Sequence, residues 1–194
     1  MGLANDDPWR KYERTTMGRR AAMRPWRPED AEELARRAND RDIWRNLSAT
    51  FPHPYTLDDA HAWIAYCQTT GDPPMQVAFT VDGQVAGGGG VERKSDVECR
   101  TGVVGAWLGR RYWGRLDTEG AAHVMMDYVF ETFDFDRLEM RVFSWNVASR
   151  RLLTNAGFPL EALQRKSVWK DQRLIDSYLF VYLREDWEMR RAAQ

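Results

Sequence analysis

The sequence has little cysteine, little lysine and no long apolar run, and each shortage excludes a class of protein. Its two cysteines, Cys67 in a helical pattern and Cys99 in a strand-like one, lack metal-ligand spacing and indicate a reducing compartment. No stretch approaches the roughly 18 consecutive apolar residues of a membrane span, and residues 1–18 are too polar for a signal peptide. We therefore expect a cytoplasmic protein with no membrane segment and no metal site.

A surplus of positive charge is also missing. The 28 basic and 29 acidic residues leave a net charge of −1, which argues against a nucleic-acid partner. Of the basic residues 24 are arginine and 4 are lysine. Guanidinium groups suit phosphate and carboxylate ligands, but a codon bias gives the same count, so the imbalance alone assigns no ligand.

The chain is long enough for one domain with a buried core, since it has 194 residues of which 43% are hydrophobic. Residues 1–18 show no sustained period, so we expect a tail there, which Trp9 and Tyr12 can dock on the body, and a single domain over residues 19–194. Hydrophobic periodicity predicts a strand, two helices, three strands, a helix, a strand, a helix and two strands. Because hairpins alternate with helices, this order indicates an α+β fold: a mixed, mostly antiparallel central sheet flanked by helices.

One segment has the features of an anion site. A buried strand over residues 101–108 runs through a turn rich in Arg and Gly directly into a helix near Thr118. The unpaired amides and dipole of a helix N-terminus attract phosphate, and Arg110, Arg111 and Arg115 can clamp it. The alternative interpretation is an exposed turn whose charges only solvate it.

Several separated segments resemble the GNAT superfamily of N-acetyltransferases, within it the branch of the RimJ and RimL ribosomal-protein acetyltransferases. The resemblance covers about residues 19–187 and rests on WRNL, FPHPYTLDDAHAWI, VDGQVAGGGG, YWGR, TEGAAHVMMDYVFE, RLEMRVFSWNVASRRLLTNAGF and YLREDW. It implies the GNAT fold and transfer of an acetyl group from the co-substrate acetyl-CoA to an amine.

The resemblance also implies residues that bind CoA. The backbone of Ala106, Trp107 and Leu108 would pair with the pantetheine arm, and the turn before the long helix would hold the pyrophosphate. The residues that match that turn are Arg111, Gly114, Arg115 and Thr118. The match ends after Arg115: read without a gap, Leu116 stands at the second small position, and read so that both flanks align, the loop is one residue short and Leu116 and Asp117 precede Thr118. The second alignment is preferred because both flanks match, and in either one Asp117 adds a negative charge to the loop.

Three further positions bear on the site. Asn146 and Ser149 stand where the family has a CoA-contacting asparagine and a serine that assists the leaving thiolate, although Asn146 suits a helix N-cap equally well. The branch usually carries a glutamate base in the strand before the turn, where this chain has Val103, which cannot accept a proton. Substitute bases are Glu98, Glu92 and His53.

The acceptor side is represented by the aromatic stretch FPHPY. Phe51, His53 and Tyr55 are expected to help form the acceptor pocket, as the equivalent loop does in the family; alternatively they plug one end of the sheet. Tyr178 and Tyr182 alternate along the last strand and are interpreted as core.

The sequence thus predicts an N-acetyltransferase that transfers the acetyl group of acetyl-CoA to a primary amine, either a protein N-terminus or a small molecule. It would act as a monomer or homodimer. The altered loop and Val103 leave a second interpretation, a GNAT-fold binding or regulatory module with impaired catalysis.

Overall fold

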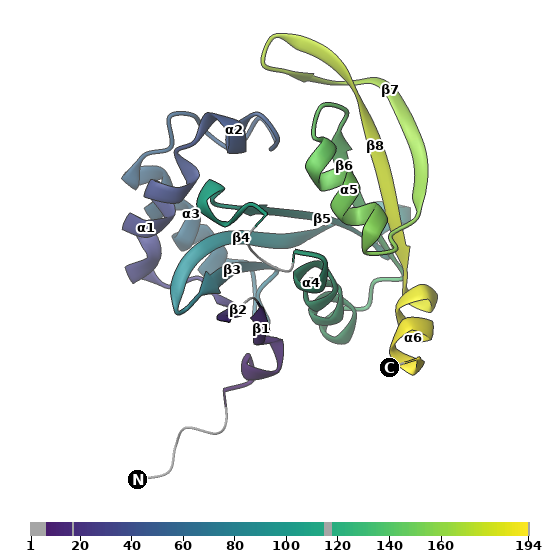
Figure 1. Ribbon diagram of the computed structural model, residues 1–194, viewed down its shortest axis with the longest axis horizontal. Coiled ribbons are helices and arrows are strands. Elements are labelled where there is room, and N and C mark those ends of the chain that lie inside the picture. Colours follow the sequence, from purple (N-terminus) through teal and green to yellow (C-terminus); the bar gives the residue numbers. More distant parts are fainter. Residues whose placement is uncertain (1–6, 17, 115–117, 194) are drawn as a thin grey trace.

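The protein is built on one eight-stranded sheet (Figure 1), as seen in a computed structural model that describes residues 7–16, 18–114 and 118–193. The strand order is β1-β2-β3-β4-β5-β6-β8-β7. Neighbouring strands are antiparallel except β5 and β6, which are parallel. The bounds are β1 (Arg14–Thr16), β2 (Arg19–Pro25), β3 (Gln76–Val81), β4 (Gln84–Arg93), β5 (Thr101–Leu108), β6 (Arg137–Phe143), β7 (Leu160–Lys170) and β8 (Arg173–Leu183). The α+β class and the mostly antiparallel sheet are confirmed.

Helices cover both faces of the sheet. They are α1 (Ala31–Ala38), α2 (Arg41–Trp44), α3 (Leu57–Thr69), α4 (Thr118–Thr132), α5 (Val147–Asn155) and α6 (Arg184–Ala192). The adjacent residues Val77 and Ala78 of β3 belong to different apolar clusters, because successive side chains of a strand point to opposite faces. Val77 packs in the cluster that contains α4, and Ala78 in the cluster that contains α1 and α3. We call these the α4 face and the α1/α3 face.

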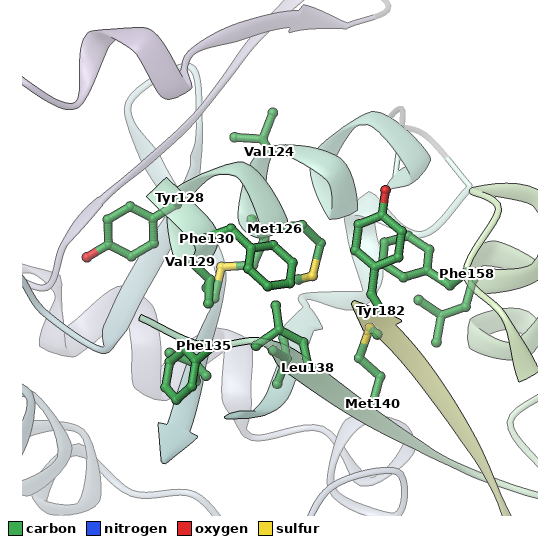
Figure 2. Packing of buried hydrophobic residues seen from close by; sticks show 14 of the residues in the cluster. Val124, Met126, Tyr128, Val129, Phe130, Phe135, Leu138, Met140, Phe158 and Tyr182 are labelled. Carbon is green, nitrogen blue, oxygen red and sulfur yellow. The ribbon is translucent and has the colours of Figure 1, made fainter. Parts of the chain in front are cut away.

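The larger core lies between α4 and the sheet, and Figure 2 shows part of it. The helix buries side chains three and four residues apart, including Met125, Met126 and Val129, as its sequence pattern predicts. Across from them lie Leu138 of β6 and Tyr182 of β8, both buried, and Tyr182 thus is core as expected. This packing fixes α4 against β6.

An Asp-Gly pair between two apolar runs, at Asp82 and Gly83, predicts a two-residue hairpin turn, and the polar residues 170–172 predict a second turn; both turns form. Asp82 and Gly83, which join β3 to β4, both have positive φ, 52° and 81°, as a two-residue hairpin turn of type I′ requires. Asp171 and Gln172 join β7 to β8 in the same way, with φ of 51° and 57°. The second turn closes a long hairpin that reaches toward α2 (Figure 1).

Four segments add to the sequence expectation or differ from it. The described part of the tail is ordered against the body: β1 pairs with β2, and Tyr12, 6% exposed, meets the ring of Tyr128 edge-on at 5.3 Å. Helices α2 and α6 were not predicted. Cys99 is exposed in the turn after a 3₁₀ helix, η3 (Asp96–Glu98), and not in a strand, because β5 begins only at Thr101.

The parallel strands β5 and β6 diverge. Their pairing ends at Val103 and Glu139, although β5 continues to Leu108 and β6 to Phe143. Beyond Val103 and Glu139 the two strands are no longer paired, so the sheet separates between the second half of β5 and the end of β6, and we call this place the split. Within the described residues, no helix is both long enough and apolar enough to cross a membrane.

Candidate active site

The second half of β5 presents a free backbone edge toward the split. The amide of Lys94 donates to the carbonyl of Thr101, and that of Gly109 donates to Ala86, so odd-numbered residues of β5 direct their backbone groups at β4. Even-numbered residues direct theirs the other way, where the pairing with β6 has already ended. The N–H and C=O of Ala106 thus face the split, where an extended amide ligand can add as a strand.

Leu108 ends this edge. Its carbonyl accepts a hydrogen bond from the indole Nε1 of Trp113 at 2.7 Å, which ties the following turn back to the strand. Its N–H shares the direction of Ala106. Trp107, the residue between them, directs its backbone at β4 and its half-buried ring at the α1/α3 face. The structure therefore fits the expected pantetheine contact at Ala106 and Leu108 better than at Trp107.

Side chains leave the α1/α3 face of β5 open. Val103 is 36% exposed although it lies in a central strand, and Gly105, two residues further on and on the same face, is exposed as well. A Cβ built on Gly105 would meet no atom within 4 Å. A substrate can reach β5 here.

The basic turn after β5 contains the 3₁₀ helix η4 (Arg110–Tyr112). Arg110 is engaged, since its guanidinium hydrogen-bonds the carboxylate of Asp42 in α2. Arg111 is exposed, lies over the Tyr112 ring at 4.9 Å, and makes no ion pair with any described residue. The Arg111 guanidinium is therefore available to bind an anion.

The rest of the expected pyrophosphate loop is partly described. Gly114 has a φ of 64°, a conformation that glycine adopts without strain. Thr118 is the first residue of α4 and is half-buried. Arg115, Leu116 and Asp117 lie outside the described residues, so their expected roles stay predictions.

Asn146 and Ser149 meet at the start of α5. The Oδ1 of Asn146 accepts a hydrogen bond from the Ser149 N–H at 3.1 Å, so Asn146 is the N-cap. Its Nδ2 and the Ser149 hydroxyl make no hydrogen bond within the described part of the chain, and both residues are half-buried. The cap and a ligand contact are compatible, because they use different atoms.

The three expected acceptor residues separate into different surroundings. The ring centroid of Phe51 lies 5.9 Å from that of Trp107, so Phe51 reaches β5. Tyr55 is 6% exposed and packs in the α1/α3 core, where burial raises the pKa of its hydroxyl. His53 is exposed and stacks on Trp44 of α2, with ring centroids 5.5 Å apart. Phe51 and His53 can line a pocket, whereas Tyr55 supports it.

An arch on the acceptor side was not predicted. Lys170, at the tip of β7, places its Nζ 4.1 Å from the centre of the Trp44 ring and donates to the carbonyl of Ser48 at 3.2 Å. Asp171 accepts a hydrogen bond from Arg41 at 2.9 Å. We call these contacts between the β7–β8 turn and the α2 segment the arch (Figure 1).

A second bridge joins the α2 segment to the start of α5. The indole of Trp145 donates to Asn46 Oδ1 at 3.1 Å, and the Arg45 guanidinium lies 4.5 Å from the Trp145 ring centre. Together with the Arg110–Asp42 pair, these contacts tie the α2 segment to β5, α5 and the long hairpin. The signal in the sequence was WRNL, but nothing local gives its partners.

The structure does not bring Glu98 to the split. Glu98 lies in η3, before β5, at the end where β5 and β6 are still paired, and its Oε1 accepts a hydrogen bond from Lys94 at 2.9 Å. Glu92 of β4 lies directly opposite Val103 in the strand pairing. Among the described residues, no group of three or more His, Cys, Asp or Glu side chains has the arrangement of a metal site.

Comparison with known proteins agrees with this architecture. The solved structure of Mycobacterium smegmatis RimJ in complex with CoA-disulfide superposes with a TM-score of 0.79 at 18% identity, covering 93% of this chain and 92% of that one. This chain, whose sheet separates between the parallel strands β5 and β6, thus has the GNAT fold.

Sequence comparison identifies the family. The acetyltransferase (GNAT) domain matches residues 20–159, and the chain belongs to the GNAT acetyltransferase family. It is 25% identical over 169 residues to the probable N-acetyltransferase YjcK of Bacillus subtilis (strain 168), covering 81% of this chain and 93% of that protein. It is 33% identical over 92 residues to the uncharacterized N-acetyltransferase p20 of Bacillus licheniformis, a match that spans 47% of this chain and 52% of that relative.

Proposed function

We propose that the protein transfers the acetyl group of acetyl-CoA to a primary amine that enters from the α1/α3 face. The observation that carries the proposal is the free edge of β5 at Ala106, which lies beside the part of β5 whose side chains are open to that face. Such an edge holds an extended amide ligand at a fixed register. The ligand's reactive end then lies where an acceptor can meet it.

Different groups would hold the two ends of the co-substrate. The amides of the pantetheine arm pair with Ala106 and Leu108, and the phosphates meet Arg111 and the N-terminal turn of α4. The thioester supplies an activated acyl group. The residues of the chain then hold it, exclude water and place the amine.

Catalysis in this arrangement rests mainly on positioning. The amine nitrogen forms a bond to the acyl carbon while the carbon–sulfur bond breaks, and the amine loses one proton. The hydroxyl of Ser149 donates a hydrogen bond to the departing thiolate of CoA. Holding two reactants together contributes more to the rate than a single base, which contributes about 10² to 10⁴-fold.

The acceptor would bind between Phe51 and the arch. Both a protein N-terminus and a small amine are extended enough to enter, and aromatic walls suit their apolar parts. A direct test is calorimetry with acetyl-CoA, followed by measurement of free thiol with N-terminal peptides, tyramine and spermidine as acceptors. Absence of acetyl-CoA binding at high micromolar concentration would contradict the proposal.

A second candidate is a binding module without turnover. It is favoured by Val103, an apolar residue in the open face at the position where the family resemblance implies a glutamate. Acetyl-CoA binding without thiol release from any of these acceptors would favour the module. Thiol release with acetylated product, shown by mass spectrometry, would favour the enzyme.

A further inference from the structure

We infer that Glu92 supplies, from the neighbouring strand β4, the proton acceptor that Val103 of β5 cannot provide. The inference rests on the proposed function, because it concerns the amine of that reaction. Val103 and Glu92 are direct partners in the antiparallel pairing of β4 with β5. Partners of this kind have side chains on the same face, with Cβ atoms about 4.5–5.5 Å apart.

Val103 and Glu92 share the α1/α3 face, from which the amine enters in the proposed function, and we also call it the acceptor face. Gly88 of β4 is the partner of Trp107, and a Cβ on Gly88 would lie 2.7 Å from the Trp26 ring, which packs in the α1/α3 cluster. The pairing from Gly88 to Glu92 has no irregularity, so every second residue keeps this face. Val91, the residue between, packs in the opposite cluster. Glu92 therefore points to the side from which β5 is open.

Glu92 differs from the other carboxylates near β5 in being unengaged. Its side chain is exposed and makes no hydrogen bond or ion pair with any residue in the described ranges. Glu139, which flanks Val103 from β6, is 9% exposed and is held by Lys94 at 2.9 Å and Arg137 at 3.0 Å. Burial alone would raise the pKa of Glu139, but these two hydrogen bonds hold it below the ordinary value.

The charged groups around Glu92 are thus accounted for. Lys94, the residue after β4, is shared by Glu98 and Glu139, and Arg137 of β6 is shared by Glu139 and Glu161. Neither cation bonds Glu92. An exposed carboxylate without a bonded partner on the α1/α3 face is the kind of group that can take a proton, directly or through one water.

The step balances without a further reactant. As the amine nitrogen bonds to the acyl carbon, its proton passes to a Glu92 carboxylate oxygen, and the carbon–sulfur bond breaks to release CoA thiolate. Protonated Glu92 then returns the proton to solvent, and the thiolate takes one from solvent. Neighbouring strands lie about 4.8 Å apart, so the Glu92 carboxylate is displaced by about that distance from one at position 103. One water molecule can bridge this distance to the amine.

The test compares Glu92→Gln with Glu188→Gln, because Glu188 is an exposed glutamate of α6, a helix that packs on the α4 face. With an N-terminal peptide or tyramine as acceptor, Glu92→Gln should lower kcat at pH 7 about 100-fold, leaving the KM for acetyl-CoA unchanged. The loss should shrink at pH 9, where free amine and hydroxide replace the base. Glu188→Gln should keep wild-type kcat.

A rescue variant separates a chemical role from a structural one. Val103→Glu in the Glu92→Gln background puts a carboxylate back on the same face, on the neighbouring strand. The double variant should have a kcat at least tenfold higher than that of Glu92→Gln alone. Equal kcat of Glu92→Gln and wild type would overturn the inference alone. Wild-type protein that binds acetyl-CoA but releases no thiol with any acceptor would overturn the proposed function, and the inference with it.

Discussion

The Nζ of Lys170 lies over the ring of Trp44, 4.1 Å from its centre, although 126 residues of chain separate them. Lys170 is 6% exposed, and burial lowers the pKa of its amine against the opposing effect of Asp171. A cation on an aromatic face is a favourable contact, worth more when water is excluded. The tip of the β7–β8 hairpin is thus attached to the α2 segment above the acceptor face.

Removing this attachment should affect the acceptor more than the co-substrate. Lys170→Ala removes the cation from Trp44 and the hydrogen bond to Ser48, together about 1–2 kcal/mol. We expect the KM for the acceptor to rise roughly tenfold, because the loosened arch no longer positions it. Steady-state kinetics with each substrate varied in turn measures this.

The control lies on the same turn. The Arg173 side chain is exposed and makes no hydrogen bond or ion pair in the described structure, so Arg173→Ala removes a charge without loosening the arch. Its KM should match wild type. A Lys170→Ala variant with unchanged acceptor KM would show that the arch does not contact the acceptor.

The sequence predicted what depends on neighbours along the chain. The Asp82–Gly83 turn and the apolar stripe of α4 are local patterns, and both are confirmed. The arch is not local: Lys170 reads as part of a polar turn, and its partner Trp44 lies in a short helix whose residues have no strong period. Tertiary packing decides such contacts.

The candidate site divides in the same way. The turn with Arg111 and the cap at Asn146 were visible in the sequence, because each lies where a predicted element ends or begins. The three candidate bases could not be ranked, since ranking needs the register that puts Glu92 opposite Val103. A shift of one residue would turn Glu92 to the other face.

Arg111 should contribute to CoA binding. Its guanidinium is exposed beside the start of the predicted phosphate loop and makes no ion pair with a described residue. Arg111→Ala removes a charge-assisted hydrogen bond to phosphate, worth about 1.5–3 kcal/mol, so acetyl-CoA binding should weaken roughly 10- to 100-fold. Calorimetry at two salt concentrations measures it. Arg36→Ala is the control, because Arg36 is bonded to Glu33. If the two variants bound acetyl-CoA equally well, the phosphates of CoA would not bind at this turn.

Two glycines of β5 should respond oppositely to alanine. A Cβ on Gly102 would lie 2.6 Å from Cγ2 of Val91 and 2.9 Å from Cδ2 of Leu138, so Gly102→Ala overpacks the α4 face and should lower the free energy of unfolding by about 1–3 kcal/mol. A Cβ on Gly105 meets nothing, so Gly105→Ala should stay within about 0.5 kcal/mol of wild type. Urea unfolding compares them. Equal destabilisation would contradict the open face at Gly105.

The ion pairs of Glu139 should make stability depend on pH. Its pKa in the folded protein is below the ordinary value of 4.5, so the folded state favours the ionised form. That contribution is complete above pH 4.5 and is lost as pH falls through the lower folded pKa. Glu139→Gln should therefore be less stable than wild type at pH 6, and the difference should shrink at pH 3. A constant difference between the two urea midpoints would contradict the assignment.

Ser149 should affect turnover and not the fold. The Ser149 N–H donates to the Oδ1 of the N-cap Asn146, whereas its hydroxyl makes no hydrogen bond with a described residue. Ser149→Ala therefore keeps the cap and removes only the proposed hydrogen bond to the thiolate. We expect kcat to fall about 10- to 100-fold, the effect of one hydrogen bond to a charged group in the transition state, with acetyl-CoA affinity unchanged. Asn146→Ala provides the contrast, because losing the N-cap costs about 1 kcal/mol of stability. If Ser149→Ala lowered stability as much as Asn146→Ala and left kcat unchanged, the hydroxyl would have a structural role, and the start of α5 would serve the fold alone.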